Sequence, residues 1–266
     1  MGDDLHNLEY MNDADLVLFV AGNQFMVMEE FLDAFKEENP IRIFYETLPP
    51  GLELRQILEG GAIFKDVVID VVPDVYASVT EKAMKKLEEA DLIEKGDYFL
   101  YLYNRIVLMV PEGNPAGIKS VEDLGRDDVR ISQPNPETED IAQYIIDMYR
   151  DAGGEALVSR IMEEKRAEGT TILTIVHHRE TPLRITKGTV DVGPVWATEV
   201  FNAKKQGLKV EMIDPGAGLD QRNNVKYYIT KLKKAPHPEN ARNFLEFIKS
   251  EKARKIYENY GFVPGF

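Results

Sequence analysis

Short apolar runs alternate with helical patterns along the first third of the chain. Residues 16–21 (LVLFVA) are continuously apolar, which is typical of a strand buried on both faces. Apolar residues then recur at helical spacing from Phe25 to Phe35, until Asn39-Pro40 ends the segment. A strand at 41–46 and a helix that ends at Gly60-Gly61 repeat this order. The alternation predicts an α/β protein with a parallel sheet and covering helices.

The remainder of the chain continues the alternation. Ser120 precedes Glu122 and Asp123 and is the expected N-cap of a helical turn. Residues 137–150 are expected to form a helix that Gly153-Gly154 stops, and residues 237–261 to form two closing helices, with Pro238 near the first helical position. Further strands are expected at 105–111, 129–134, 171–176, 190–196, 208–213 and 224–229.

Composition and charge narrow the possible functions. The chain has 266 residues, of which 44% are hydrophobic, which is ordinary for a globular protein. Its 46 acidic and 32 Lys and Arg residues give a formal net charge of −14, which disfavours binding to nucleic acids. Cys is absent, which excludes disulfides, thiolate metal sites and a catalytic cysteine.

The first residues are polar and acidic. Residues 1–14 contain few apolar positions and are expected to form a flexible, loosely attached arm. They do not have the character of a signal peptide, and no run approaches the length of a membrane span. Two interpretations remain open: a cytosolic protein, or an exported protein whose leader is absent from this sequence.

The order of these segments resembles the type II periplasmic solute-binding proteins of ABC importers, most closely the molybdate- and tungstate-binding branch. The resemblance covers nearly the whole chain from about residue 15. It is carried by FVAGNQFMVMEEFLDAFKEEN, LELRQILEGG, DVYASVTEKAMKKLEEADLI, NRIVLMVPEGNPAGIKSVEDL, VRISQPNP, KGTVDVGPVWATE and HPENARNFLEFIKSEKARKIYENYGFVP. The fixed order of these segments is more specific than any one of them.

The resemblance implies a two-lobe α/β fold, in which each lobe is a mostly parallel sheet flanked by helices. No linker separates the lobes, so one is expected to be inserted into the other. Lobe 1 is expected to comprise residues 15–102 and 225–266, and lobe 2 residues 103–224. The lobes of this family close by a hinge on a small ligand, where strand ends and helix starts offer free N–H groups to an anion.

The resemblance also implies which loops hold the ligand. The family holds its ligand through loops that follow several strands, and two serines and a tyrosine contribute hydroxyl groups. The matching positions of this chain provide no such hydroxyl donor: they are Asn23, Gly51, Glu139-Asp140-Ile141, His178-Arg179 and Trp196. A stretch of about eleven residues around IFKDVVIDVVP is additional to the usual spacing.

Each of these residues also has a structural interpretation. Asn23 suits a helix N-cap, and its amide could in addition donate to a ligand. Gly51 could belong only to a stiff turn, or could let a ligand approach the backbone. Trp196, the one Trp, could pack in the core or form a cleft wall whose indole N–H donates. Arg179 could pair with an oxyanion or carboxylate, whereas Arg184 could instead brace an acidic residue.

A metal site is the second hypothesis. His177 and His178 are adjacent, although the chain has only four His residues. Together with Glu139 or Asp140 they could form a nitrogen–oxygen site for a divalent metal, but no established metal-binding motif supports this. Acidic residues at the start of a helix are also expected for electrostatic reasons alone.

The leading hypothesis is an extracytoplasmic solute-binding component of an ABC importer. It captures a small anion, either an oxyanion such as molybdate or tungstate or a small carboxylate, and passes it to a membrane permease. Phosphate-binding and hydrolase motifs are absent, so an enzyme is not expected. The resemblance implies a monomer, and no cofactor is expected. A third hypothesis is a cytosolic ligand-sensing domain on the same fold.

Overall fold

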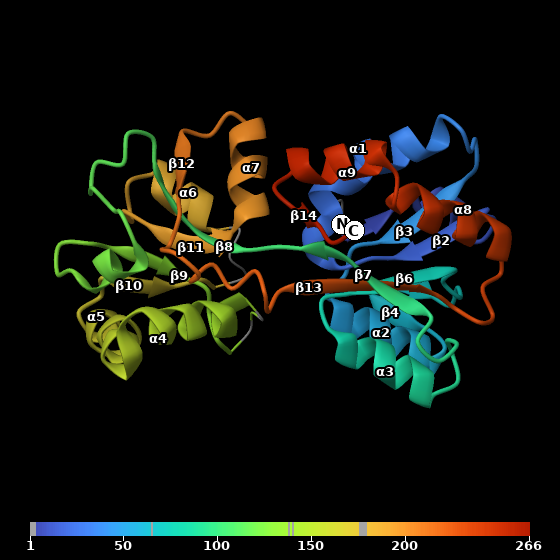
Figure 1. Cartoon of the computed structure of the whole chain (residues 1–266), viewed down its shortest axis with the longest axis horizontal. Helices are drawn as coiled ribbons and strands as arrows, with labels where there is room; N and C mark the ends of the chain where they lie inside the picture. The colour runs from blue at the N-terminus through green and yellow to red at the C-terminus, as the bar shows by residue number, and fades with distance from the viewer. Residues whose placement is uncertain (1–3, 65, 138, 140, 176–179) are drawn as a thin grey trace. The chain divides into compact units, whose positions relative to one another are not determined.

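The computed structural model consists of two compact units (Figure 1). It describes residues 4–64, 66–137, 139, 141–175 and 180–266. The first unit contains residues 1–103 and 225–266, and the second contains residues 104–224. The chain therefore leaves the first unit once, forms the second unit, and returns.

The first unit is built on a seven-stranded mixed sheet with the strand order β1-β3-β2-β6-β13-β7-β14. Its strands are β1 (Leu5–His6), β2 (Leu16–Phe19), β3 (Ile43–Glu46), β6 (Val75–Ser78), β7 (Tyr98–Tyr103), β13 (Lys226–Lys231) and β14 (Val263–Pro264). Strand β2 pairs in parallel with β3 and β6, so their carboxyl ends lie at one edge. The pairs made by β13, β14 and β1 are antiparallel.

Helices cover both faces of this sheet. They are α1 (Phe25–Lys36), α2 (Pro50–Glu59), α3 (Glu81–Glu89), α8 (Pro238–Ile248) and α9 (Glu251–Asn259). Figure 1 shows α1, α8 and α9 on one face and α2 and α3 on the other. Phe31 of α1 packs against Phe244, Phe247 and Tyr257 of the last two helices. The first and last helices of the chain therefore belong to one core.

Residues 4–14 are attached to the first unit, so the expectation of a loose arm over 1–14 is wrong for them. Leu5 is buried, and β1 pairs antiparallel with β3. The ring of His6 stacks on Tyr45 at a centroid distance of 4.2 Å, and its Nε2 lies 2.8 Å from the Thr47 hydroxyl. The short 3₁₀ helix η1 (Leu8–Tyr10) follows. The attachment of this segment could not be read from the sequence, because a strand of two residues is too short to show a hydrophobic period.

The additional stretch around residues 63–73 forms a small separate sheet in the first unit. It pairs β4 (Ala62–Phe64) antiparallel with β5 (Val67–Ile69). Asp66 beside the connection has a φ of 69°, a left-handed conformation that Asp adopts more readily than most residues. The insertion therefore lies outside the seven-stranded sheet.

The second unit has two small sheets. Strands β11 (Gly193–Trp196) and β12 (Val210–Ile213) both pair antiparallel with β8 (Ile106–Pro111). Strands β9 (Ile131–Gln133) and β10 (Thr171–Leu173) pair in parallel. The flanking helices are η3 (Val121–Gly125), α4 (Ile141–Ser159), the π-helical turn η4 (Arg160–Glu164), α5 (Lys165–Ala167), α6 (Glu180–Thr186) and α7 (Ala197–Lys205).

The α/β class expected from the sequence is confirmed, and the pairing is more mixed than expected. In both units antiparallel strands complete the sheets: β13 returns from the second unit and pairs between β6 and β7, and β11 and β12 flank β8. Ser120 forms the expected capping turn with Asp123, and Pro238 is the first residue of α8. Helix α4 begins at Ile141 rather than 137, and Gly153 and Gly154 have non-helical conformations within it.

Candidate functional site

Asn23 lies where β2 ends and the chain turns into α1. It belongs to the 3₁₀ turn η2 (Gly22–Gln24), which leads directly into the helix. Gly22 lies against the loop that follows β3: a Cβ atom there would be only 2.9 Å from the Thr47 carbonyl oxygen. A side chain at position 22 would therefore force the two loops apart, and the Gly lets the turn that contains Asn23 lie against Thr47 and Leu48.

The side-chain amide of Asn23 forms only some of the hydrogen bonds that it could form. Its Nδ2 donates to the hydroxyl oxygen of Tyr227 on β13. Its Oδ1 is buried, and no described group donates to it. Asn23 therefore forms no side-chain N-cap bond, and the structural interpretation alone does not explain its environment.

Gly51 lies in the first turn of α2. Pro50 begins this helix and has no N–H, so Gly51 is the first helical residue with a backbone donor. A Cβ atom placed on Gly51 would meet nothing within 4 Å, and the residue is exposed. Gly51 thus offers the first backbone N–H of the helix, on an exposed residue at its positive end.

The loop between β3 and α2 is held from several directions. The Leu48 N–H donates to Glu53 Oε1 at 3.1 Å, and the Tyr76 hydroxyl donates to the Pro50 carbonyl at 2.9 Å. The Thr47 N–H donates to the Asp4 carbonyl at 2.8 Å. These bonds fix the backbone that leads to Gly51.

Two fully buried carboxyl groups lie beneath this loop. Glu46 ends β3, and its Oε1 accepts a bond from Gln56 Nε2 at 3.1 Å. Desolvation raises the pKa of Glu46 to about 7, although the Gln56 bond opposes this. Desolvation, with the nearby Glu46, raises the pKa of Glu53 well above its ordinary value, while the Leu48 N–H lowers it. Burial therefore shifts both groups toward the protonated, neutral form.

Gln24 adds to the incompletely bonded oxygens in this region. It is fully buried, and its Nε2 donates to the Tyr101 hydroxyl at 2.7 Å. The oxygens without a described partner are Gln24 Oε1, Asn23 Oδ1, Glu46 Oε2 and Glu53 Oε2. Sequence reasoning identified only Asn23 among these residues. The available signals were Glu46 at the end of an apolar strand and Gln24 beside Asn23.

In the second unit, Trp196 ends β11 and precedes α7. Its side chain is 6% exposed, and its ring lies 5.9 Å from that of Tyr144 on α4. The first N–H of α7, from Ala197, already donates to the Arg105 carbonyl at 2.9 Å. Trp196 thus packs against α4, one turn from the predicted residue Ile141, whose side chain is itself buried.

Glu139 braces two strand ends of the second unit. Its Oε1 accepts the Asn135 N–H at 3.1 Å and also accepts a bond from the Thr174 hydroxyl. Asn135 follows β9 and Thr174 follows β10, and the Asn135 N–H also reaches the Thr174 hydroxyl at 3.0 Å. The carboxylate therefore joins two loops, which is a structural role that the metal hypothesis did not consider.

Arg184 has the bracing role expected from the sequence. Its Nη2 donates to Glu180 Oε2 at 2.7 Å and to the Leu173 carbonyl at 3.0 Å, and its Nη1 donates to the Ile172 carbonyl at 3.0 Å. Nη1 also lies 3.3 Å from the Ser132 hydroxyl, which is 2.9 Å from that of Thr181. Arg184 therefore ties α6 to β9 and β10.

Four predicted site residues lie outside the described residues: Asp140, His177, His178 and Arg179. Over the described part of the chain, no group of three or more His, Asp or Glu side chains could hold a metal ion. Nor does any helix within those residues have the length and apolar character to cross a membrane.

The structure brings Asn23 and the loop before Gly51 together in the first unit, and Trp196 and the start of α4 together in the second. The arrangement in the first unit combines a helix start with an amide whose buried end has no described partner. Such an arrangement is suited to binding a small polar solute, because the remaining bonds can be supplied by the solute.

Comparison with known proteins identifies the family to which the chain is similar. The family of bacterial extracellular solute-binding proteins matches residues 16–263. A Bacillus subtilis protein assigned as an ABC transporter substrate-binding lipoprotein, YvgL, is 27% identical over 77% of this chain and 72% of its own length. A sulfate-binding protein from Synechococcus elongatus is also 27% identical. That match covers 77% of this chain and 61% of the length of the sulfate-binding protein.

A similar fold occurs in a solved structure from Clostridium difficile, a substrate-binding domain assigned to a molybdenum ABC transporter. It superposes with a TM-score of 0.73 and 18% identity, over 93% of this chain and 97% of that one. At this identity the likeness shows the shared fold, which is that of the two-unit α/β solute-binding proteins.

Proposed function

Because the chain belongs to the family of bacterial extracellular solute-binding proteins, we propose that it captures a small oxyanion for an ABC importer. Members of this family bind solutes and are not enzymes, as the sequence predicted. The family places the chain outside the cytoplasm. The oxyanion, the permease and the residues that contact the solute are parts of the proposal.

The observation that carries the proposal is the unmatched amide of Asn23. The two ends of an amide have nearly the same shape, and their assignment follows from the hydrogen bonds available. If the amide is rotated by 180°, the Tyr227 hydroxyl donates to Oδ1, and Nδ2 points where the unpartnered oxygen lay. In that orientation Asn23 offers a buried donor that an oxyanion satisfies.

The start of α2 supplies a second donor. Gly51 is exposed at the start of α2, and the positive end of a helix favours a negative charge. A tetrahedral oxyanion has several acceptor oxygens, so it suits the Asn23 amide and the Gly51 N–H together. The related protein named for sulfate and the structural neighbour assigned to molybdenum transport both favour this class of solute.

The second unit contributes to the proposal through residues that the sequence singled out. We propose that the Ile141 N–H at the start of α4 and the Trp196 ring contact the solute, together with Asp140, His178 and Arg179 of the adjoining loops. Closure of the two units by a hinge on the bound anion, and handover to the permease, also remain proposals. Small-angle scattering tests the closure, because it predicts a smaller radius of gyration with solute.

Isothermal titration calorimetry tests the proposed function. The protein is titrated with molybdate, tungstate, sulfate, small carboxylates, Zn²⁺ and Ni²⁺. Saturable binding of at least one oxyanion is the expected result. Binding of Zn²⁺ or Ni²⁺ alone, lost on replacing His177 and His178 together by Ala but kept in Arg179→Ala, would support the metal hypothesis instead.

A further inference from the structure

Glu46 and Glu53 have no role in the solute contacts proposed above, although they are the two fully buried carboxyl groups nearest to the β3–α2 loop. Glu46 ends β3, and Glu53 lies two residues after Gly51. Each has one oxygen, Oε2, without a partner among the described groups. A buried carboxylate with an unpaired oxygen is costly, whereas a neutral carboxyl is not.

Among the described residues, no positively charged side chain is found that would stabilise two carboxylates at this pair. Within the described residues, no Lys or Arg forms an ion pair with either group. Glu53 faces Glu46 of β3, the Tyr76 phenol of β6 and the Tyr101 phenol of β7, and Glu46 faces Gln56 of α2. These neighbours are neutral or acidic, so only the hydrogen bonds from Gln56 and the Leu48 N–H favour the ionised state of the pair, and burial opposes it.

Glu53 also controls the position of the loop. Its Oε1 accepts the Leu48 N–H, and Leu48 lies in the segment that leads to Pro50 and Gly51. The same segment faces Gly22, next to Asn23. A change in the charge of Glu53 therefore acts on the loop that offers the Gly51 N–H, and it places a negative charge two residues from that N–H.

We propose that Glu46 and Glu53 are positioning residues that must carry protons for the chain to bind an anion tightly, so that solute affinity falls as the pH rises. This inference rests on the proposed function. An anion at Gly51 and a carboxylate at Glu53 repel each other. Binding of the anion therefore favours the protonated pair, and loss of a proton from the pair weakens the binding of the anion. The pair thereby makes the affinity of the site dependent on pH.

The test is the ratio of dissociation constants for sulfate at about pH 9 and about pH 6. Sulfate keeps its charge across this range, whereas Glu46, whose pKa is raised to about 7, does not. In the wild type the affinity is expected to be roughly tenfold or more weaker at the higher pH. In Glu53→Gln and in Glu46→Gln the ratio is expected to be smaller than in the wild type, because each amide removes one ionisable group of the pair. Circular dichroism at both pH values checks that each variant is folded.

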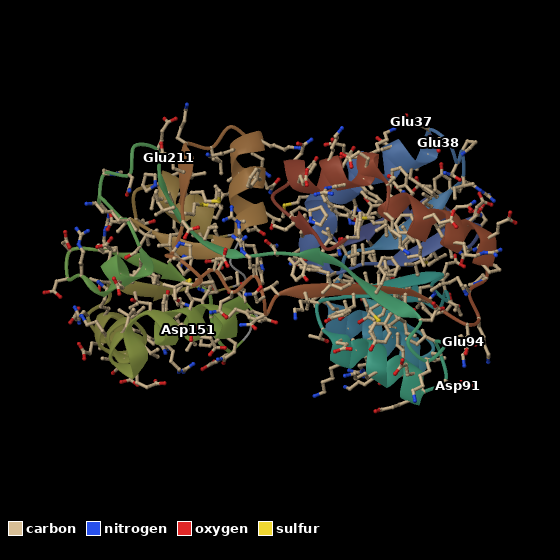
Figure 2. The ribbon with its side chains drawn as sticks, viewed as in Figure 1. Glu37, Glu38, Asp91, Glu94, Asp151 and Glu211 are labelled. Atoms are coloured by element: carbon tan, nitrogen blue, oxygen red, sulfur yellow. The ribbon has the colours of Figure 1, made fainter. Side chains whose placement is uncertain are left out.

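The matched control is Glu38→Gln. Glu38 is an exposed residue just beyond α1, and its side chain lies on the outer surface of the first unit (Figure 2). This variant is expected to keep the ratio of the wild type. Sulfate binding with a pH-independent affinity in the wild type, or with the same ratio in all four proteins, would overturn the inference and leave the proposed function intact. If sulfate does not bind, the panel oxyanion that binds takes its place, and failure of every oxyanion at both pH values would overturn the proposed function itself.

Discussion

The strand ends of the two units differ in how completely their polar groups are bonded. In the second unit, Arg184, Glu139 and Ser132 use their side chains to join neighbouring strands and loops. In the first unit, four buried oxygens next to the β2 and β3 strand ends have no described partner, whereas in the second unit the one such oxygen among the described residues is the Thr171 hydroxyl on β10. A more completely bonded region has a fixed geometry, whereas an incompletely bonded one can gain stability from a solute or a proton.

This contrast assigns different tasks to the two units. The second unit holds its loops through internal bonds, so losing one of these bonds should cost stability. The first unit leaves donors and acceptors for other molecules, so changes there should alter affinity and pH dependence more than stability. The following substitutions test the contrast, starting with the largest expected effect.

Replacing Arg184 by Ala should destabilise the protein by about 3 kcal/mol, because Glu180 and the carbonyls of residues 172 and 173 lose a charged donor. Urea denaturation gives the free energy of unfolding. Arg55→Ala is the matched control, since Arg55 also pairs with a Glu four residues away but is exposed. That change should cost less than about 0.5 kcal/mol. Equal costs would contradict the assigned role of Arg184.

Replacing Asn23 by Asp should weaken oxyanion binding by about a hundredfold or more, because a carboxylate replaces the amide donor and repels the anion. Calorimetric titration measures the loss. Asn243→Asp, an exposed change on α8, controls for the added negative charge and should change affinity less than about threefold. Unchanged affinity in Asn23→Asp would remove Asn23 from the site.

Replacing Glu46 by Gln should stabilise the protein at pH 8 by about 2 kcal/mol. The pKa of Glu46 in the folded chain is about 7, above its ordinary value of 4.5, because the group is buried. The unfolded chain therefore releases this proton first, and the stability of the wild type falls as the pH rises from about 4.5 to about 7. Denaturation at several pH values should show a smaller fall in Glu46→Gln. An unchanged fall would mean that Glu46 is ionised in the folded chain.

Replacing Gly51 by Ala should have the smallest effect. The added methyl group has open space, and Ala favours a helix, so stability should rise by about 0.5 kcal/mol. Solute affinity should nevertheless fall by about threefold to tenfold, because the methyl group restricts approach to the N–H. Thermal denaturation and titration separate the two effects. A gain in stability with full affinity would show that the solute does not approach Gly51.

Much of the fold could be predicted because apolar runs and helix signals record which surfaces are buried. The run at 16–21 predicted β2, and Ser120 and Pro238 marked element starts correctly. The pairing of β1 could not be predicted, because it depends on two residues whose partner lies about 40 positions away. The antiparallel pairs, such as those of β13 with β6 and β7, were missed for the same reason: local pattern does not specify which distant strand pairs with which.

The candidate site could be predicted only in part. Position in the loop after a strand pointed to Asn23 and Gly51, and their contact with a solute stays a prediction. Glu46 and Glu53 were missed, because an acidic residue near a helix start is usually solvated, and only the folded structure shows that both are buried. Their protonation depends on neighbours from three strands, which no local spacing reveals.

Hydrogen–deuterium exchange with and without a bound oxyanion tests the contrast between the two units most directly. The account predicts that the oxyanion slows exchange at residues 22–24 and 47–53 of the first unit, where bonds are incomplete. The internally bonded segments around Arg184 should exchange slowly in both states. Exchange rates at residues 22–24 and 47–53 that do not change when the oxyanion binds would contradict the account.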